Sequence, residues 1–325
     1  MTEPLLDVRD LSVRFETDNG TTHAVDRVSF SLSAGEVLGI VGESGCGKSV
    51  TTMAMLRLLP PTAVVSGRAL FDGTDLLQAS SGELRRIRGR EISFVFQEPM
   101  TSLNPVFTVG RQIGEVLREH LGLSKRAARE RTVELLDLVH IPAPQRRVDE
   151  YPHQLSGGMR QRVMIAMAVA CDPRILIADE PTTALDVTIQ AGILDLMREL
   201  RERLGTAIVL ITHNLGVVAD IADRVAVMYA GRKVEEAPVG ELFAAPQHPY
   251  TIGLLGAVPR GGTQRLREIP GRVPSLEVLP DACVFAPRCP RADEACVARE
   301  PLLAAVRPEH AVACVHPGVA EAAAV

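Results

Sequence analysis

The sequence predicts an α/β fold with a mostly parallel sheet, and three observations support this prediction. The apolar run Val37 to Val41 leads directly into a glycine-rich loop and a helix-like stretch. The second half of the chain alternates strand-like and helix-like segments, as parallel strands with crossover helices require. Between these parts, residues 99–160 carry apolar residues at helical spacing among charges, which predicts a helical insertion.

Composition limits the function classes. The chain has 325 residues and is 46% hydrophobic, enough for one large domain or two smaller ones. We find no apolar run long enough to cross a bilayer and no secretion signal at the N-terminus. A net charge of −5 argues against broad nucleic-acid binding, and 3% aromatic residues argue against a base-stacking platform.

Two β-like runs, Leu6 to Phe15 and Val25 to Leu32, open the chain and flank a turn signal at Asn19-Gly20. The prolines Pro60-Pro61 are expected to stop the helix that follows the glycine-rich loop. The other elements are expected at Ser49 to Leu59 (helix), Ile92 to Phe96 (strand), Val109 to His120 and Ala127 to Val139 (helices), Met159 to Ala170 (helix), Ile175 to Ala178 (strand), Thr188 to Leu204 (helix), Ala207 to Ile211 (strand) and Arg224 to Glu236 (closing strands).

The glycine-rich loop fits the phosphate-binding pattern G-x-x-x-x-G-K-[ST] in full. Its glycines let backbone N–H groups converge on phosphate oxygens, and the following helix directs its positive end at them. Lys48 supplies a point charge near the β- and γ-phosphates, and Ser49 offers a hydroxyl to Mg²⁺. The predicted ATP-binding residues are Gly42, Ser44, Gly45, Cys46, Gly47, Lys48, Ser49 and Val50, with the Cys46 side chain a bystander.

Two acids follow the apolar strand Ile175 to Ala178. Asp179 is placed as the Mg²⁺-directing acid of phosphate-loop enzymes, and Glu180 is close enough to polarise a water in line with the γ-phosphate. A solvated acid pair without a role is the alternative, and the phosphate loop disfavours it.

Together with Leu155-Ser156-Gly157-Gly158-Met159, these motifs resemble the ATP-binding subunits of ABC transporters over about residues 4–240. The resemblance implies a RecA-like phosphate-loop core with a β-subdomain and a helical signature subdomain. It implies that the signature motif binds the ATP of a facing subunit, through a helix N-terminus suited to anions. The residue roles that it implies are adenine stacking by Phe15, dimer contact by Ala184-Leu185-Asp186, ATP contact by Ser156, Gly157 and Gly158, catalysis by Glu180, His213 and Gln97, and Mg²⁺ binding by Ser49, Gln97 and Asp179.

A narrower resemblance, to the D-type ATPases of dipeptide and oligopeptide importers, lies in Lys48-Ser49-Val50-Thr51, in the stretch from Phe96 to Pro105 and in Met159-Arg160-Gln161-Arg162. His248-Pro249-Tyr250-Thr251 and the cysteine-bearing tail also resemble that group. The resemblance implies a second, non-identical ATPase, two membrane permeases and an extracytoplasmic binding protein. It places the chain peripherally on the cytoplasmic face of the inner membrane. We expect an ATP-binding domain at 1–240 and a C-terminal appendage at 241–325.

Four of the six cysteines lie in the Pro- and Arg-rich tail: Cys283, Cys289, Cys296 and Cys314. Without a C-x-x-C pair, a zinc ribbon is disfavoured. Four thiolates could ligate a [4Fe–4S] cluster, although their spacing is not a common ferredoxin pattern. The resemblance to the importer tail favours the cluster, with zinc and free or disulfide-bonded thiols as the alternatives. Cys171 is expected to end a helix in the core and to serve packing.

Two other functions remain as alternatives. The same motor could serve another solute, such as nickel, glutathione or a sugar oligomer, because the ATPase need not touch the cargo. A non-transport ABC ATPase acting in translation or DNA repair is the second. Such chains usually carry two cassettes or long coiled-coil insertions, and this chain has neither.

Overall fold

The computed structural model describes residues 3–17, 20–97, 102–183, 186–257, 269–274 and 277–318, and the side chain of Val187 is outside this description. The chain divides into two compact units. The first comprises Met1–Ser33, Val37–Gln78 and Ile211–Val325, and the second comprises Ala34–Glu36 and Ala79–Leu210. Among the helices that these described ranges contain, none has both the length and the apolar character to cross a membrane.

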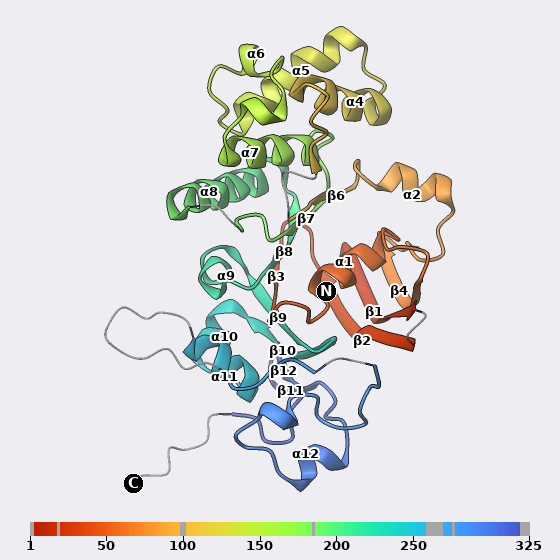
Figure 1. Ribbon diagram of the computed structural model, residues 1–325, viewed down its shortest axis with the longest axis vertical. Helices are drawn as coiled ribbons and strands as arrows, with labels where there is room; N and C mark the ends of the chain where they lie inside the picture. The colour runs from red at the N-terminus through yellow and green to blue at the C-terminus, as the bar shows by residue number, and fades with distance from the viewer. Residues whose placement is uncertain are drawn as a thin grey trace. The chain divides into compact units, whose positions relative to one another are not determined.

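The first unit begins with an antiparallel sheet in the order β2-β1-β4-β5 (Figure 1). Buried Leu6, Val8, Leu11 and Val13 form the inner face of β1. The register shifts after Val8, near Asp10, whose φ of 47° marks an irregularity in the strand. The strands span β1 (Leu6–Thr17), β2 (Gly20–Leu32), β4 (Ala63–Phe71) and β5 (Thr74–Asp75).

A second set of strands in the same unit runs in the order β11-β12-β10-β9-β3. Every residue of β3 is buried and the strand pairs in parallel with β9, as expected for a central strand. Gly39 lets helix α9 approach β3, because a Cβ there would lie 2.9 Å from Val218 Cγ1. The bounds are β3 (Val37–Val41), α1 (Lys48–Met55), α9 (Leu215–Ile221), β9 (Arg224–Tyr229), β10 (Arg232–Pro238), α10 (Val239–Ala244), α11 (Pro249–Gly256), η2 (Ala286–Arg288), α12 (Glu294–Ala298), β11 (Ala304–Arg307) and β12 (His310–Val312).

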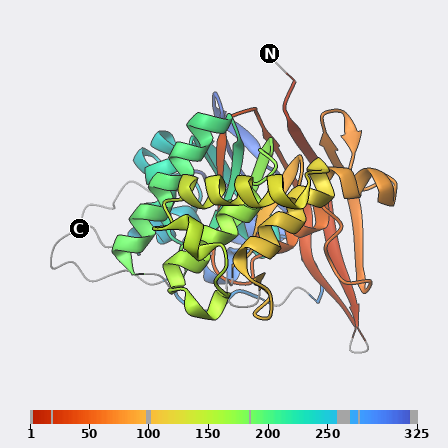
Figure 2. The same ribbon diagram turned by 90° about the horizontal axis from the view of Figure 1, so that it is seen from above.

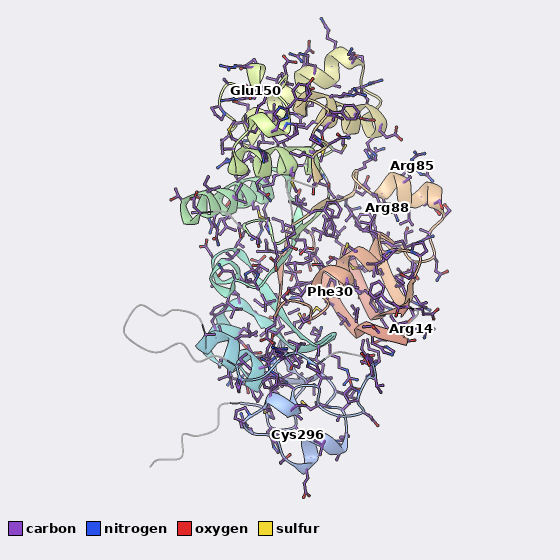
Figure 3. All side chains as sticks on the ribbon, in the orientation of Figure 1. Arg14, Phe30, Arg85, Arg88, Glu150 and Cys296 are labelled. Atoms are coloured by element: carbon purple, nitrogen blue, oxygen red, sulfur yellow. The ribbon has the colours of Figure 1, made fainter. Side chains whose placement is uncertain are left out.

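The C-terminal tail joins this sheet through β12, which pairs antiparallel with β10. Beside that pairing the fully buried carboxylate of Glu235 accepts hydrogen bonds from the N–H groups of Gln247 (2.6 Å) and His248 (2.9 Å). The ring of His310 on β12 lies 2.8 Å from the same side chain. A buried carboxylate needs such partners, so Glu235 ties three segments together. Figure 3 labels Cys296 on the tail beyond them.

The second unit contains the strands β8, β7 and β6 and a group of helices, coloured yellow to green in Figure 2. Helices α4, α5 and α7 contact one another, and side chains of Thr108, Ser124 and Ser156 cap their N-termini. The elements are α2 (Ser81–Ile87), β6 (Ile92–Val95), α4 (Val109–Leu121), α5 (Lys125–Leu138), α6 (Pro144–Arg147), η1 (Pro152–Gln154), α7 (Gly157–Ala168), β7 (Ile175–Asp179), α8 (Val187–Leu204) and β8 (Ala207–Thr212).

The α/β prediction is confirmed, and two local predictions are wrong. Helix α1 ends at Met55, before Pro60-Pro61, because Arg57 adopts a left-handed conformation with φ of 50°. Helix α7 ends at Ala168, so buried Cys171 follows the helix instead of ending it. Strands β4 and β5 and helix α2 were not predicted, although Ser80 and Glu83 form a capping box at α2 that is legible in the sequence. The Asn19 turn and residues 98–101 lie outside the described residues.

Candidate functional site

The phosphate loop connects β3 to α1 in the first unit, and two of its glycines are required by close backbone contacts. Gly42 has φ of 154°, and a Cβ there would lie 2.2 Å from the Met228 carbonyl oxygen. Gly47 has φ of 98°, and its Cβ would lie 2.4 Å from the Ala24 carbonyl oxygen. Gly45 faces open space with φ of 79°. The loop can therefore fold tightly only with glycine at 42 and 47.

The ammonium group of Lys48 lies inside this loop. Lys48 as a residue is 5% exposed, and its ammonium donates hydrogen bonds to the carbonyl oxygens of Gly42 (2.9 Å) and Glu43 (3.0 Å). Helix α1 starts after Gly47, and within the described residues its N-terminus has no side-chain cap. Ser44 and Gly45 are exposed and Ser49 is half-buried. Such an uncapped helix start with a buried cation fits an anionic phosphate.

Cys46 packs beneath the loop. Its side chain is fully buried, and burial raises the pKa of the thiol. Its carbonyl oxygen accepts the N–H of Gly231, from the turn between β9 and β10 (3.0 Å). Its sulfur lies 3.8 Å from the Lys48 ammonium. That the Cys46 side chain is a bystander, and that Cys46 and Val50 contact the nucleotide, stay predictions.

Phe15, the predicted adenine-stacking residue, lies on β1 opposite Thr22 and Ala63 and is half-exposed. Helix α1 contacts β1 in the same unit. A half-exposed aromatic ring is compatible with base stacking, and this role stays a prediction.

In the second unit, the predicted general base is held by two donors. Gln97 Nε2 donates to Glu180 Oε2 at 3.0 Å, and the Thr183 hydroxyl donates to the same oxygen at 2.8 Å. Gln97 and Glu180 meet because β6 and β7 pair in parallel, so the residues that follow them share one sheet edge. Glu180 also has φ of 46°, unusual for a non-glycine residue. Sequence reasoning missed Thr183.

Asp179 ends the buried strand β7 and is 5% exposed, next to Glu180. The predicted switch residue His213 follows β8 in the first unit and is exposed. Asn214 beside it caps α9 by accepting the N–H of Gly216 at 2.9 Å. The roles of His213 and Asp179 stay predictions.

The signature residues open helix α7, as the sequence predicted. The Ser156 hydroxyl accepts the N–H of Met159 at 3.4 Å, and Ser156 and Gly157 are exposed. Gly158 is buried, and a Cβ there would lie 2.8 Å from Ile189 Cγ2 on α8. The two glycines therefore differ: Gly157 leaves open space at the helix start, whereas Gly158 permits close packing of α7 on α8.

The loop before α8 supports that contact. Asp186 caps α8 by accepting the N–H of Ile189 at 2.9 Å, so the residue that packs against Gly158 is itself held by the cap. Ala184 and Leu185, predicted to contact a facing subunit, lie outside the described residues.

All four tail cysteines line one small cavity of about 10 Å³, together with His248 and His316. The N–H groups of Arg291 and His316 point at the sulfurs of Cys289 and Cys314, each at 3.4 Å. Burial raises the pKa of Cys283, Cys296 and Cys314. None of the six cysteines forms a disulfide.

Backbone N–H groups that point at sulfur are a common tuning device of thiolate-bound metal centres, and the metal role of the four cysteines stays a prediction. A second group of possible metal ligands overlaps it: Asp293, Cys296 and His316 place donor atoms within 4.8 Å of one another. The cavity is about the size of a single water, so a cubane cluster would need more space than it offers.

Family models match two parts of the chain. One described as ABC transporter matches residues 25–183, and one described as oligopeptide/dipeptide transporter, C-terminal region, matches residues 234–296. A probable peptide ABC transporter ATP-binding protein of Sinorhizobium fredii is 55% identical and covers 95% of this chain and 94% of the relative. A putative peptide import ATP-binding protein of Brucella abortus is 53% identical over 93% and 92% of the two chains.

Solved structures resemble the cassette part. A dimeric ATP-binding cassette in a post-hydrolysis state with ADP and Pi has a TM-score of 0.65 and 30% identity, covering 72% of this chain and 98% of that chain. A protein from Clostridium perfringens, part of an ABC transporter complex, has a TM-score of 0.62 and 30% identity, covering 75% of this chain and 92% of that chain.

The packing of Gly158 can be tested against its neighbour. Gly158→Ala is expected to lower the free energy of unfolding by roughly 1–3 kcal/mol, because the new methyl group overpacks the contact with Ile189. Gly157→Ala, in open space, is the matched control and should change it by less than about 1 kcal/mol.

Urea unfolding measures both variants. Adding Ile189→Ala to Gly158→Ala removes the clash, so the two substitutions should cost less together than their sum. Equal effects of the two glycine variants would contradict the packing role.

Proposed function

The chain belongs to the ATP-binding subunits of ABC transporters, and we propose that it drives the import of di- and oligopeptides. It is an ATPase by membership of that family. The match of residues 234–296 to the oligopeptide/dipeptide transporter C-terminal region supports a peptide cargo. So do relatives above 50% identity that are named peptide import proteins.

The hydrogen bonds on Glu180 carry the proposed mechanism. Gln97 and Thr183 hold one oxygen of this carboxylate. In the proposed reaction Glu180 accepts a proton from the attacking water while that water adds to the γ-phosphorus and ADP leaves. Gln97 orients the carboxylate and the water, and His213 contacts the γ-phosphate.

The phosphate loop binds the nucleotide in this proposal. The Lys48 ammonium and the N–H groups at the start of α1 face the phosphates, and Phe15 stacks on adenine. Mg²⁺, when bound, would supply positive charge that offsets the charge developing on the phosphates. Ser49, Gln97 and Asp179 would hold it, and their hydroxyl, amide and carboxylate oxygens suit a hard cation.

The signature residues supply a second half-site. Ser156 and Gly157 are exposed at the start of α7, where N–H groups and the helix dipole favour an anion. In our proposal they receive the ATP bound to a facing, non-identical ATPase subunit. Two permease subunits and an extracytoplasmic binding protein complete the importer. The chain then works peripherally at the cytoplasmic face of the inner membrane, without nucleic acid.

The four tail cysteines are proposed to bind a [4Fe–4S] cluster. Their convergence on one cavity and the N–H groups aimed at Cys289 and Cys314 support this assignment. A cluster at this position would have a structural role in the tail, since no step of ATP hydrolysis calls for electron transfer.

Glu180→Gln tests the general base. The amide retains an acceptor for Gln97 and Thr183 but cannot take a proton at neutral pH, so turnover should fall by about 10²–10⁴. Phosphate release measures turnover, and ATP binding and ATP-dependent dimerisation are expected to persist. The exposed Glu202→Gln on α8 is the charge-matched control. Near-normal turnover of Glu180→Gln would refute the assignment.

Reconstitution tests the cargo. The native permease complex, co-purified with this chain and combined with its binding protein in vesicles, should hydrolyse ATP faster with di- or oligopeptides than without. Stimulation by nickel, glutathione or a sugar oligomer, and none by peptides, would replace the proposed cargo. Stimulation of the chain by nucleic acid would point to a non-transport ATPase.

Anaerobic purification tests the cluster. The protein should be coloured and contain iron and sulfide in equal amounts. Cys289→Ser should lower both, whereas Cys171→Ala, at a buried cysteine outside the tail, should lower neither. Colourless protein without iron would refute the cluster, and stoichiometric zinc would favour the zinc alternative.

A further inference from the structure

Glu43, the second residue of the phosphate loop, is contacted by two residues from the C-terminal part of the chain. Its N–H donates a hydrogen bond to the hydroxyl of Tyr250 at 2.8 Å. Its carboxylate accepts a bidentate pair of hydrogen bonds from Arg288, with Nη1 at 2.6 Å from Oε2 and Nη2 at 3.0 Å from Oε1. All three residues belong to the first unit. A two-pronged Arg–carboxylate pair fixes direction as well as distance.

Contacts other than the one to Glu43 also orient the Arg288 guanidinium. Its side chain is only 5% exposed, and the guanidinium also donates to the carbonyl oxygens of Pro270 (2.8 Å) and Ile269 (3.2 Å). The tyrosine hydroxyl of Tyr229 lies 3.4 Å from Nη1. Acceptor oxygens of four residues therefore hold one planar group, which leaves the guanidinium little freedom to turn away from the loop.

The side chain of Tyr250 is also held in place by its neighbours, as that of Arg288 is. It is fully buried on α11, and its ring packs against the rings of Tyr229 and Phe285, with centroids 4.7 and 5.4 Å apart. His248 caps this helix by accepting the N–H of Tyr250 at 3.0 Å. The hydroxyl that meets Glu43 is thus presented by a rigid aromatic cluster.

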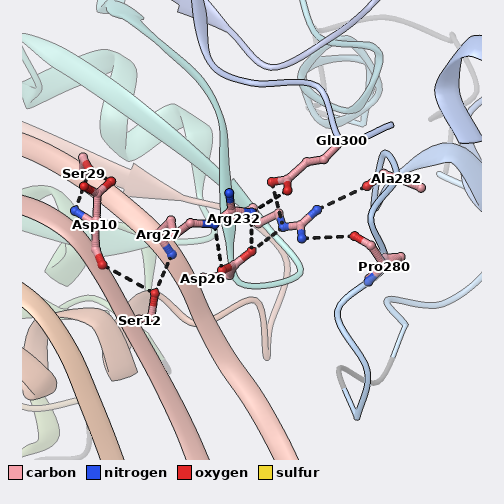
Figure 4. Close-up of polar contacts among 9 residues, drawn as sticks. All are labelled: Asp10, Ser12, Asp26, Arg27, Ser29, Arg232, Pro280, Ala282 and Glu300. Carbon is pink, nitrogen blue, oxygen red and sulfur yellow. Dashed lines mark hydrogen bonds and ion pairs between the residues drawn. The ribbon is translucent and has the colours of Figure 1, made fainter. Parts of the chain in front are cut away.

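The segment that leads to Arg288 is anchored on the sheet, as Figure 4 shows. Arg232 on β10 donates to the carbonyl oxygens of Pro280 and Ala282, both at 3.2 Å, and to Asp26 at 2.7 Å. Glu300 of the tail pairs with the same guanidinium at 3.3 Å and also with Arg27. This network holds the tail on β2 and β10, so the contacts to Glu43 start from a fixed base.

The contact between Arg288 and the Glu43 carboxylate bears on nucleotide binding through its charge. The Glu43 carbonyl already accepts from Lys48, the cation that serves the phosphates. An unbalanced carboxylate one residue after Gly42 would repel a polyphosphate and compete for the Lys48 ammonium. Arg288 balances that charge, and Tyr250 holds the backbone of the same residue.

We propose that Arg288 and Tyr250 are positioning residues for the phosphate loop, through which the C-terminal region strengthens ATP binding. The proposal rests on the ATP-binding function and extends it to a part of the chain outside the cassette motifs. The loop shape and the charge balance at Glu43 are set together by residues more than 200 positions away in the sequence.

Calorimetric titration with ATP tests this in the full chain. Arg288→Gln should weaken ATP binding about tenfold, which corresponds to a loss of roughly 1.4 kcal/mol in binding free energy. Tyr250→Phe keeps the aromatic packing and should weaken it by a smaller factor. Arg307→Gln, on the exposed strand β11 of the same tail, is the charge-matched control and should leave the affinity unchanged.

The route of the effect is tested by a double-mutant cycle with Glu43→Gln. If Arg288 acts through the Glu43 charge, Arg288→Gln should cost less than about twofold in the Glu43→Gln background. The same loss in both backgrounds, or an unchanged affinity of Arg288→Gln, would overturn the proposal. Thermal unfolding of each variant separates loss of folding from loss of affinity. Arg288→Lys keeps the positive charge and should bind ATP better than Arg288→Gln.

Lys48→Ala separates this inference from the assignment on which it rests. Loss of binding in Lys48→Ala with unchanged Arg288→Gln would overturn the positioning role alone. Retained binding in Lys48→Ala would overturn the phosphate-loop assignment itself.

Discussion

The buried ammonium of Lys48 is the constraint around which the first unit is arranged. A cation with 5% exposure is stable only if several acceptors surround it, and the loop supplies the carbonyl oxygens of Gly42 and Glu43. The turn that brings those oxygens together requires glycine at 42 and 47, because neighbouring backbone occupies the space of a Cβ. The same turn leaves the first N–H groups of α1 without a side-chain cap. One arrangement therefore satisfies the cation and creates the anion site.

In the second unit, the strands and a turn position the carboxylate of Glu180. Parallel pairing of β6 and β7 brings Gln97 beside Glu180, and the left-handed backbone at Glu180 turns its side chain out of the strand direction. In the same unit, the Asp186 cap, Ile189 and Gly158 set the distance between α7 and α8. The exposed start of α7 is thus presented by a close helix contact.

The C-terminal tail is part of the first unit's architecture. Glu235 gathers the N–H groups of Gln247 and His248 and the ring of His310 around one buried carboxylate, and the Arg232 network holds the tail at a second place. Within that frame, Arg288 reaches Glu43 and the next residue, Cys289, lines the cysteine cavity. One short turn therefore contacts the phosphate loop through Arg288 and lines the cysteine cavity through Cys289.

Local sequence was sufficient for the α/β class, the phosphate loop, strand β3 and the signature helix start, because each depends on spacing within a few residues. It did not predict the early end of α1, where Arg57 adopts a left-handed conformation without being glycine. It did not predict strand β4 either, because the pairing of β4 with β1 joins segments far apart in the sequence. Thr183 was missed for a different reason, because its contact with Glu180 lies within one turn of the chain and depends on the left-handed backbone at Glu180.

Residue type and spacing thus determined by themselves which groups could meet a phosphate, a metal or a water. Only the tertiary structure decided that Gly158 serves packing, that the four cysteines share one cavity, and that Arg288 and Tyr250 hold Glu43. Those outcomes depend on contacts between segments far apart in the chain. Burial and charge balance select such contacts when the whole unit packs, and no short pattern encodes them.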